Sequence, residues 1–114
     1  MVSKAIARFA RISPRKARVV VDLVRGRQAG EALQLLEFTA KSGAPVLKKV
    51  IESAVANART QSPDVDLDAL FVQTAFVDKA PNNHMRRWRP RAMGRATRIQ
   101  KGMSHITVEL GVRD

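Results

Sequence analysis

Apolar and polar residues alternate with a period of two in three separate segments, which predicts three β-strands. The first covers residues 2–11, where Ala5, Ala7 and Phe9 alternate with Lys4 and Arg8. The second covers residues 70–78, and the third covers residues 104–112. In the second, one side carries Leu70, Val72, Thr74 and Phe76, and the other carries Phe71, Gln73, Ala75 and Val77.

Between the first two strands, apolar residues recur at helical spacing in three segments. The first helix begins after Ser13, a residue suited to the N-cap, and Pro14 is suited to its first position. It runs to about Arg25, because Gly26 is suited to end a helix. Its apolar stripe comprises Ala17, Val20, Val21 and Val24. A second, short helix covers residues 29–38, with Leu33, Leu36 and Phe38 available for burial. A third covers residues 46–59, where Ala54, Ala56 and Ala58 allow close packing.

The last two strands predict a long hairpin between them. If Phe71 lies opposite Leu110, the turn falls near position 90, with Pro90 and Gly94 flanking the tip, and residues 79–101 form one arm. About eleven residues on each side, at about 3.3 Å per residue, reach roughly 36 Å, well beyond a compact domain. An isolated ribbon of two strands is marginally stable in water, so we expect this arm to need a scaffold.

Charge is distributed in blocks and identifies that scaffold. Residues 1–27 hold 8 basic and 1 acidic side chains, residues 28–78 hold 4 and 7, and residues 79–101 hold 8 and 0. The net charge is +11 on 114 residues. Such an excess favours a polyanionic partner, and the preference for Arg in the arm favours phosphate contact and stacking on bases. We therefore expect a nucleic acid as the target.

A disordered, solvated tail is the other interpretation of such a basic run. The run is internal, however, it is bracketed by two predicted strands, and it contains Met85, Trp88, Met93 and Ile99. We expect Trp88 to be exposed or to face RNA.

The first turns of the first predicted helix contain three cations, Arg15, Lys16 and Arg18. The helix dipole is unfavourable to cations at this end and favourable to a bound phosphate, so a phosphate bound nearby would offset the repulsion.

The chain length fits a single domain, residues 1–114, with a core large enough to need no disulfide or metal. It contains no cysteine, and its longest apolar runs are far too short to span a bilayer. The first residues lack a secretory pattern. A soluble, cytoplasmic protein without membrane insertion is expected.

No residue pattern in the sequence meets the requirements of a catalytic or metal-binding site. Asp64, Asp66 and Asp68 resemble the start of a calcium loop, but Ala69 and Ala75 stand where that loop needs Gly and Glu. We expect these aspartates to cap a turn. The two histidines, His84 and His105, have neither a cysteine nor a carboxylate pair beside them. The sequence predicts neither an enzyme, nor a metal site, nor a cofactor.

Four motifs, in this order, resemble ribosomal protein twenty-two of the large subunit. They are Ser13-Pro14-Arg15-Lys16-Ala17-Arg18, Ser53-Ala54-Val55-Ala56-Asn57-Ala58, residues 86–96 and Ser104-His105-Ile106-Thr107. The resemblance covers essentially the whole chain. It implies an α+β fold, in which a three-stranded antiparallel sheet packs against three helices and carries a long, extended β-hairpin.

The same resemblance implies a structural constituent of the large ribosomal subunit. Such a protein binds several domains of ribosomal RNA, stabilises their packing during assembly and contacts neighbouring ribosomal proteins. Its hairpin lines the exit tunnel and meets the nascent polypeptide.

Site residues follow from matching these motifs. The expected contacts to ribosomal RNA are Lys4, Arg8, Arg11, Ser13, Arg15, Lys16, Arg18, Arg25, Arg27, Lys79, Asn82, Asn83, His84, Arg86, Arg87, Arg89, Arg91, Arg95, Arg98, Lys101 and His105. The expected tunnel-facing tip comprises Met85, Arg86, Arg87, Trp88, Arg89, Pro90, Arg91, Ala92, Met93 and Gly94. Gly102, Met103 and Met93 depart from the family pattern, which puts one or two phosphate contacts in doubt.

Two other functional classes fit parts of the pattern. Pro90 between Arg89 and Arg91 is compatible with an architectural DNA-binding arm, whose proline wedges a base step. Such proteins usually act as dimers, and no further apolar helix face demands a partner chain. A membrane-active cationic protein fits less well, because the basic segment has a strand pattern and little continuous apolar face.

Overall fold

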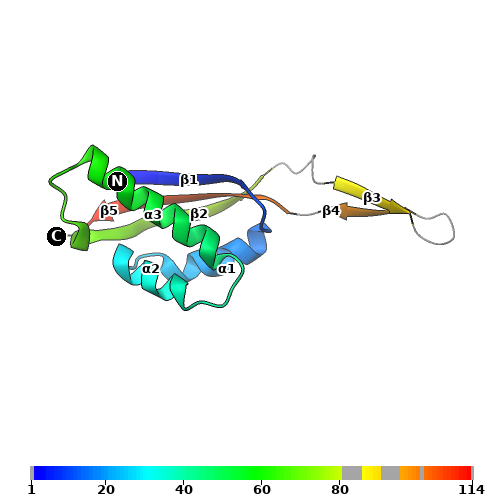
Figure 1. The fold of residues 1–114 in the computed structure, drawn as a ribbon, viewed down its shortest axis with the longest axis horizontal. Helices are drawn as coiled ribbons and strands as arrows, with labels where there is room; N and C mark the ends of the chain where they lie inside the picture. Colours follow the sequence, from blue (N-terminus) through cyan, green and yellow to red (C-terminus); the bar gives the residue numbers. More distant parts are fainter. Residues whose placement is uncertain (1, 81–85, 91–95, 101, 114) are drawn as a thin grey trace.

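The computed structural model describes residues 2–80, 86–90, 96–100 and 102–113. In chain order its elements are β1 (Ser3–Ala10), α1 (Pro14–Val24), α2 (Ala29–Glu37), α3 (Ala44–Gln61), the short 3-10 helix η1 (Leu67–Ala69), β2 (Leu70–Lys79), β3 (Arg86–Pro90), β4 (Ala96–Gln100) and β5 (Ser104–Val112). β5 lies between β1 and β2, and both pairings are antiparallel. The three α-helices cover one face of this sheet, and β3 and β4 form a separate ribbon beyond it (Figure 1). The expected α+β class is confirmed.

The core forms between the helices and the covered face of the sheet. All four residues of the α1 stripe are buried, as expected, together with Leu47, Ile51 and Ala54 of α3. Val108 and Leu110 of β5 are fully buried beneath them. Ser3 of β1 donates a 2.7 Å hydrogen bond to the carbonyl of Ala54, which fixes the distance between β1 and α3. Ala54 and Ala58 are fully buried, whereas Ala56 is exposed.

A β-bulge makes the predicted alternation of β2 wrong beyond its first three residues. The register shifts between Val72 and Thr74. Leu70 and Val72 are buried before this shift, and Ala75 and Val77 are buried after it. A bulge inserts one extra residue, so every later side chain changes face. Phe76, expected on the same face as Val72, is instead 40% exposed on the uncovered face.

The predicted position of the hairpin turn also needs correction. Phe71 pairs with Gly111, and Val72 pairs with Leu110, one position away from the expected register. In the ribbon, Arg86 pairs with Gln100 and Pro90 pairs with Ala96. These pairs centre the connection on position 93, three residues beyond the expected turn. Pro90 therefore lies at the end of β3.

Two aromatic residues of the predicted apolar patterns are exposed. Phe9 has a positive φ of 54°, at an irregularity between Ala7 and Ala10, and its side chain is 52% exposed. Phe38 follows the last residue of α2 as its C-cap and is 86% exposed. α3 begins at Ala44, two residues earlier than predicted, because Pro45 is suited to a first helical turn.

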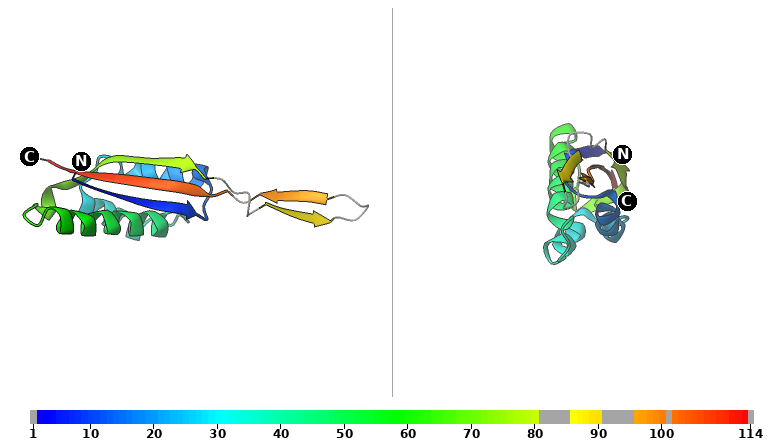
Figure 2. Two further views of the ribbon diagram at one scale, coloured as in Figure 1. Left: turned by 90° about the horizontal axis from the view of Figure 1, so that it is seen from above. Right: turned by 90° about the vertical axis from the view of Figure 1, so that its right-hand side faces the viewer.

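The ribbon gives the molecule a long axis. Its principal dimensions are 65 × 26 × 16 Å, and the radius of gyration of its Cα atoms is 17.1 Å. A compact domain of this length would have a radius of about 13 Å. β3 and β4 extend away from the end of the sheet at which β2 finishes and β5 begins (Figure 2).

Candidate nucleic-acid interface

The segment that leads from β1 into α1 is a capped helix start surrounded by cations. Ser13 accepts a hydrogen bond from the backbone N–H of Lys16 at 3.3 Å, and Pro14 occupies the first turn. No acidic residue lies in that turn. The remaining N–H groups of the first turn and the helix dipole therefore favour an anion here. We call residues 11–16 the cationic turn.

The cationic turn is attached directly to the base of the arm. The hydroxyl of Ser104, the first residue of β5, donates a 2.7 Å hydrogen bond to the carbonyl of Ile12. A Cβ on Gly102 would lie 3.0 Å from the Cα of Ser13, so only glycine fits this close approach without displacing backbone. Across the base, Ala80 donates to the carbonyl of Met103 at 2.9 Å.

A surface hollow of about 410 Å³ adjoins the turn. It is lined by Arg11, Ile12, Ser13, Lys16, Ser42, Val46 and Gly102. Ser42 immediately precedes the N-cap of α3, so the first turns of two helices border the same hollow. Arg11, Arg15 and Lys16 are all exposed. Two helix N-termini and several exposed cations form a surface suited to phosphate groups.

Lys41 and Ser42 belong to this surface and were missed by the sequence prediction. Both line a second hollow of about 280 Å³ with Lys16 and Val19 of α1. The sequence presents residues 41–45 as a loop between two helices, and nothing local indicates that its cation lies beside α1. Only the packing of α3 against the start of α1 brings them together.

Three predicted RNA-contacting arginines make hydrogen bonds within the protein. Arg25 donates to the carbonyl of Ala75 through Nε at 3.2 Å and Nη2 at 2.8 Å. Arg18 donates to the carbonyl of Val77 at 3.2 Å. Arg27 donates to the carbonyl of Leu23 at 2.7 Å, near the end of α1. Arg18 and Arg25 thereby hold α1 against β2, whereas the bond from Arg27 returns to α1 itself. Contact of these three arginines with RNA stays a prediction.

Arg25 also forms the one ion pair found among the described residues, with Asp22 at 2.7 Å. Both side chains are about half exposed or more, at 48% and 64%, so the pair contributes little to stability. The other cations near the cationic turn are therefore not neutralised by carboxylates within the described part of the chain.

Other predicted contacts lie on the face of the sheet that no helix covers, or at its margin. Lys4 and Arg8 of β1 and Lys79 at the end of β2 are exposed. His105 is half-buried, and its Nδ1 accepts a 3.1 Å hydrogen bond from the N–H of Phe9. The two rings meet edge to face at 4.7 Å between their centroids. His105 thus makes a hydrogen bond within the protein, and its contact with RNA stays a prediction.

Charge is polarised along the sheet. Asp66 caps η1 by accepting a 3.0 Å hydrogen bond from the N–H of Asp68, just before β2 begins, as expected for a capped turn. Lys79 is the last residue of the ten-residue strand β2, at the base of the arm. A ten-residue strand spans about 33 Å. The carboxylates of η1 therefore lie at the end of the sheet opposite the arm, whereas the cationic turn lies at the end from which the arm extends (Figure 1).

Several predicted contacts lie outside the described residues, namely Asn82, Asn83, His84, Met85, Arg91, Ala92, Met93, Gly94, Arg95 and Lys101. Arg86, Arg87, Trp88, Arg89 and Pro90 are in β3 and Arg98 is in β4, where the strand pairing is described. Opposed residues there include Trp88 with Arg98 and Arg87 with Ile99.

Within the described ranges, no three His, Cys, Asp or Glu side chains gather into a possible metal site. None of the described helices has the length and apolar character required to cross a bilayer.

Comparison with known proteins identifies the family. Residues 5–111 match the family described as ribosomal protein L22p/L17e. The chain is 68% identical over 113 residues to the large ribosomal subunit protein uL22 of Sorangium cellulosum, covering 99% of each chain. It is 51% identical over 110 residues to the protein of the same name from Syntrophobacter fumaroxidans, covering 96% of this chain and 97% of the relative. The resemblance seen in the sequence motifs is thereby confirmed, and the chain belongs to the L22p/L17e family of ribosomal proteins.

Proposed function

We propose that this protein binds ribosomal RNA of the large subunit through two connected surfaces, the cationic turn and the arm of residues 79–101. The observation that carries the proposal is their attachment. Ser104 and Gly102, at the base of the arm, contact Ile12 and Ser13 of the turn. Binding of one surface to RNA therefore orients the other, and both lie at the end of the sheet away from the carboxylates of η1.

As a member of its family, the chain is a structural, non-enzymatic component of the large ribosomal subunit and resides in the cytoplasm within the ribosome. The finer mechanism follows from electrostatics. Cations of the turn and arm neutralise phosphates where RNA segments converge, and this stabilises the packing of RNA domains during assembly. The RNA in turn offsets the mutual repulsion of the cations in the arm.

In this proposal, residues 1–114 form one domain, and the arm of residues 79–101 extends from it. The end of that extension, residues 85–94, would line the exit tunnel and face the nascent polypeptide. Its cluster of Arg87, Trp88, Arg89 and Arg91 provides a positive and partly apolar surface. Such a surface can slow nascent chains of matching character.

Sedimentation of tagged protein from cell lysate tests the ribosomal assignment. We expect co-migration with large subunits, lost after ribonuclease treatment. A light fraction insensitive to ribonuclease would contradict the proposal, and association with DNA lost after deoxyribonuclease would favour an architectural DNA-binding role.

The tunnel-lining role has a separate test. Arg87, Arg89 and Arg91 are replaced together by Gln, and ribosome pausing is measured on messages that stall the parent ribosome. We expect altered pausing at a subset of sites with normal subunit assembly. Unchanged pausing in assembled subunits would contradict contact with the nascent chain and leave RNA binding intact.

A further inference from the structure

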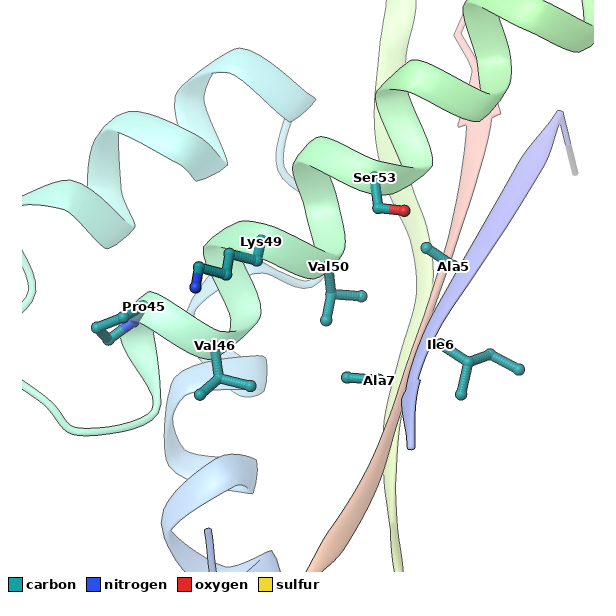
Figure 3. A pocket seen from close by; sticks show the side chains of 8 residues that line it. All are labelled: Ala5, Ile6, Ala7, Pro45, Val46, Lys49, Val50 and Ser53. Atoms are coloured by element: carbon teal, nitrogen blue, oxygen red, sulfur yellow. The ribbon is translucent and has the colours of Figure 1, made fainter. Parts of the chain in front are cut away.

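A β-bulge in β1 changes the face of the sheet on which Phe9 lies. The register shifts between Ala7 and Ala10, where two residues of β1 lie opposite the single residue His105 of β5. Ala7 points toward α3, whereas Ile6 points away from it, toward the uncovered face (Figure 3). Regular alternation would place Phe9 on the same side as Ala7. Phe9 instead lines a hollow on the uncovered face together with Ile6 and His105.

The bulge in β2 has the same effect on Asp78. Because the register shifts between Val72 and Thr74, every later residue of β2 lies on the face opposite to the one that regular alternation gives it. Asp78 therefore lies on the uncovered face, where it pairs with His105 and lines the same hollow. Bulges re-aim side chains next to functional sites, and here one in each outer strand directs a side chain into a single hollow.

Phe9 is held in this hollow in a strained conformation. Its φ of 54° lies in the left-handed region, which bulky L-residues rarely adopt. His105 fixes it twice, because Nδ1 accepts the hydrogen bond from the N–H of Phe9 and the imidazole meets the phenyl ring edge to face. The side chain of Phe9 is nevertheless half exposed. Strained residues cluster at binding sites, and an exposed aromatic ring offers a face on which a nucleobase stacks.

Polar groups surround the ring of Phe9 in the hollow. Its volume is about 300 Å³, and it is lined by Ile6, Arg8, Phe9, Asp78, His105 and Thr107. Thr107 is only 6% exposed, and its hydroxyl makes no hydrogen bond to another described residue. Every fully buried polar side-chain atom in the described ranges has a partner, so this hydroxyl is open to the hollow. Arg8 and Asp78 form no ion pair with each other or with any further described residue. A ligand here thus meets a carboxylate, a hydroxyl and a guanidinium.

The carboxylate of Asp78 determines which nucleobase fits the hollow. Asp78 directly precedes the arm, in which residues 79–101 hold 8 basic and no acidic side chains. A carboxylate repels phosphate, and it only accepts hydrogen bonds. Guanine is the one RNA base whose Watson–Crick edge presents two adjacent donors, N1–H and N2–H, and these match the two oxygens of a carboxylate. That edge is accessible where the base is unpaired.

We propose that this hollow binds an unpaired guanine of ribosomal RNA. The base stacks on the phenyl ring of Phe9, and its N1–H and N2–H donate to the carboxylate of Asp78. Arg8 contacts the adjoining phosphate, and the hydroxyl of Thr107 bonds to a polar atom of the nucleotide. This inference rests on the proposed binding of ribosomal RNA, and it adds a base-specific site to the two surfaces that contact phosphates.

Binding of the full-length protein to purified large-subunit ribosomal RNA, measured over a range of salt concentrations, tests the stacking. Phe9→Leu removes the aromatic ring but keeps an apolar side chain, and Phe9→Tyr keeps the ring as the matched control. We expect Phe9→Leu to weaken binding about tenfold, the effect of losing one stacked base. The slope of log affinity against log salt should not change, because stacking releases no counterions. Phe9→Tyr should bind as the parent does.

Asp78→Asn is an independent variant for which contact and absence of contact predict opposite signs. If Asp78 does not touch RNA, removing its negative charge should leave binding unchanged or strengthen it. If it accepts from guanine, the amide offers one acceptor in place of two, and we expect binding to weaken about tenfold. Glu109 lies on the same face, opposite Lys4 and outside the hollow, so Glu109→Gln is the matched control. It should bind at least as tightly as the parent.

Chemical probing with kethoxal, which reacts with N1 and N2 of unpaired guanines, locates the nucleotide. At saturating protein, we expect one guanine that the parent, Phe9→Tyr and Glu109→Gln protect and that Phe9→Leu and Asp78→Asn leave reactive. Circular dichroism verifies that each variant is folded. Equal protection by all variants, no protected guanine, or unchanged or tighter binding of Asp78→Asn would overturn this inference, while a steep salt slope would still support the proposed function. Absence of RNA binding, or a slope near −2, would instead contradict the proposed function and this inference with it.

Discussion

The hydroxyl of Ser104 donates a 2.7 Å hydrogen bond to the carbonyl of Ile12, joining residues 92 positions apart in the chain. Ser104 is fully buried, and it stands where the arm returns to the sheet. Ile12 directly precedes the N-cap of α1. This single bond therefore connects the base of the arm with the cationic turn.

Replacing Ser104 by Ala should reduce the free energy of unfolding by about 1–3 kcal/mol, because the buried carbonyl of Ile12 loses its partner. Thermal unfolding followed by circular dichroism measures this change. Ser42→Ala, at an exposed loop position, is the control and should stay within about 0.5 kcal/mol of the parent. Equal effects of the two substitutions would show that the bond does not hold the arm base.

Gly102→Ala should destabilise the same junction by steric means. The new Cβ would lie 3.0 Å from the Cα of Ser13 and 3.4 Å from the Cδ of Pro14. Backbone must shift to admit it, and overpacking of this kind costs about 1–3 kcal/mol. We also expect weaker binding to ribosomal RNA, since the arm and turn no longer share one orientation. Unchanged stability and unchanged affinity would contradict the junction as described.

Gly26→Ala should be destabilising through backbone strain alone. Gly26 has a φ of +83° at the end of α1, and a Cβ there would meet nothing within 4 Å. The left-handed conformation costs an L-residue about 1–2 kcal/mol. Asn tolerates this conformation better than Ala, so Gly26→Asn should cost measurably less in chemical denaturation. A larger cost for Asn than for Ala would exclude strain as the cause.

Alanine substitutions of Arg25 and Arg15 should affect different properties, the first stability and the second RNA affinity. Arg25→Ala removes two hydrogen bonds to the carbonyl of Ala75, and we expect a loss of about 0.5–1.5 kcal/mol in unfolding free energy. Arg15 is exposed and makes no hydrogen bond to a described residue, so Arg15→Ala should leave stability unchanged. It should weaken RNA binding and lower the salt dependence by about one unit. A loss of stability from Arg15→Ala, together with a loss of RNA affinity but not of stability from Arg25→Ala, would contradict these roles of the two arginines.

Much of the fold follows from local patterns in the sequence. Ser13, Pro14 and Gly26 delimit α1 by capping chemistry, and the buried stripe from Ala17 to Val24 follows from helical spacing. These signals are local, so they can be recognised in the sequence without knowledge of the tertiary structure. Bulges are different. The shift between Val72 and Thr74 leaves no clear mark in the sequence, and it alone moved Ala75 and Val77 into the core.

The candidate site was predictable in its charge and less so in its geometry. The cations of residues 11–18 are visible as a block in the sequence. Whether a given arginine is bound within the protein, as Arg18 and Arg25 are, depends on which carbonyls an edge strand presents. Lys41 joins the cationic surface through packing between α1 and α3, which no local pattern encodes. Long-range placement therefore decides both which arginines bond within the protein and which cations join this surface.

The salt dependence of binding tests the account most directly, because it counts the phosphates that the protein neutralises. Affinity for purified large-subunit ribosomal RNA is measured over a range of salt concentrations. If about half of the sixteen cations in residues 1–27 and 79–101 reach phosphates, the slope of log affinity against log salt should be near −7, by the calibration for duplex DNA. A slope near −2 would contradict binding through two connected cationic surfaces.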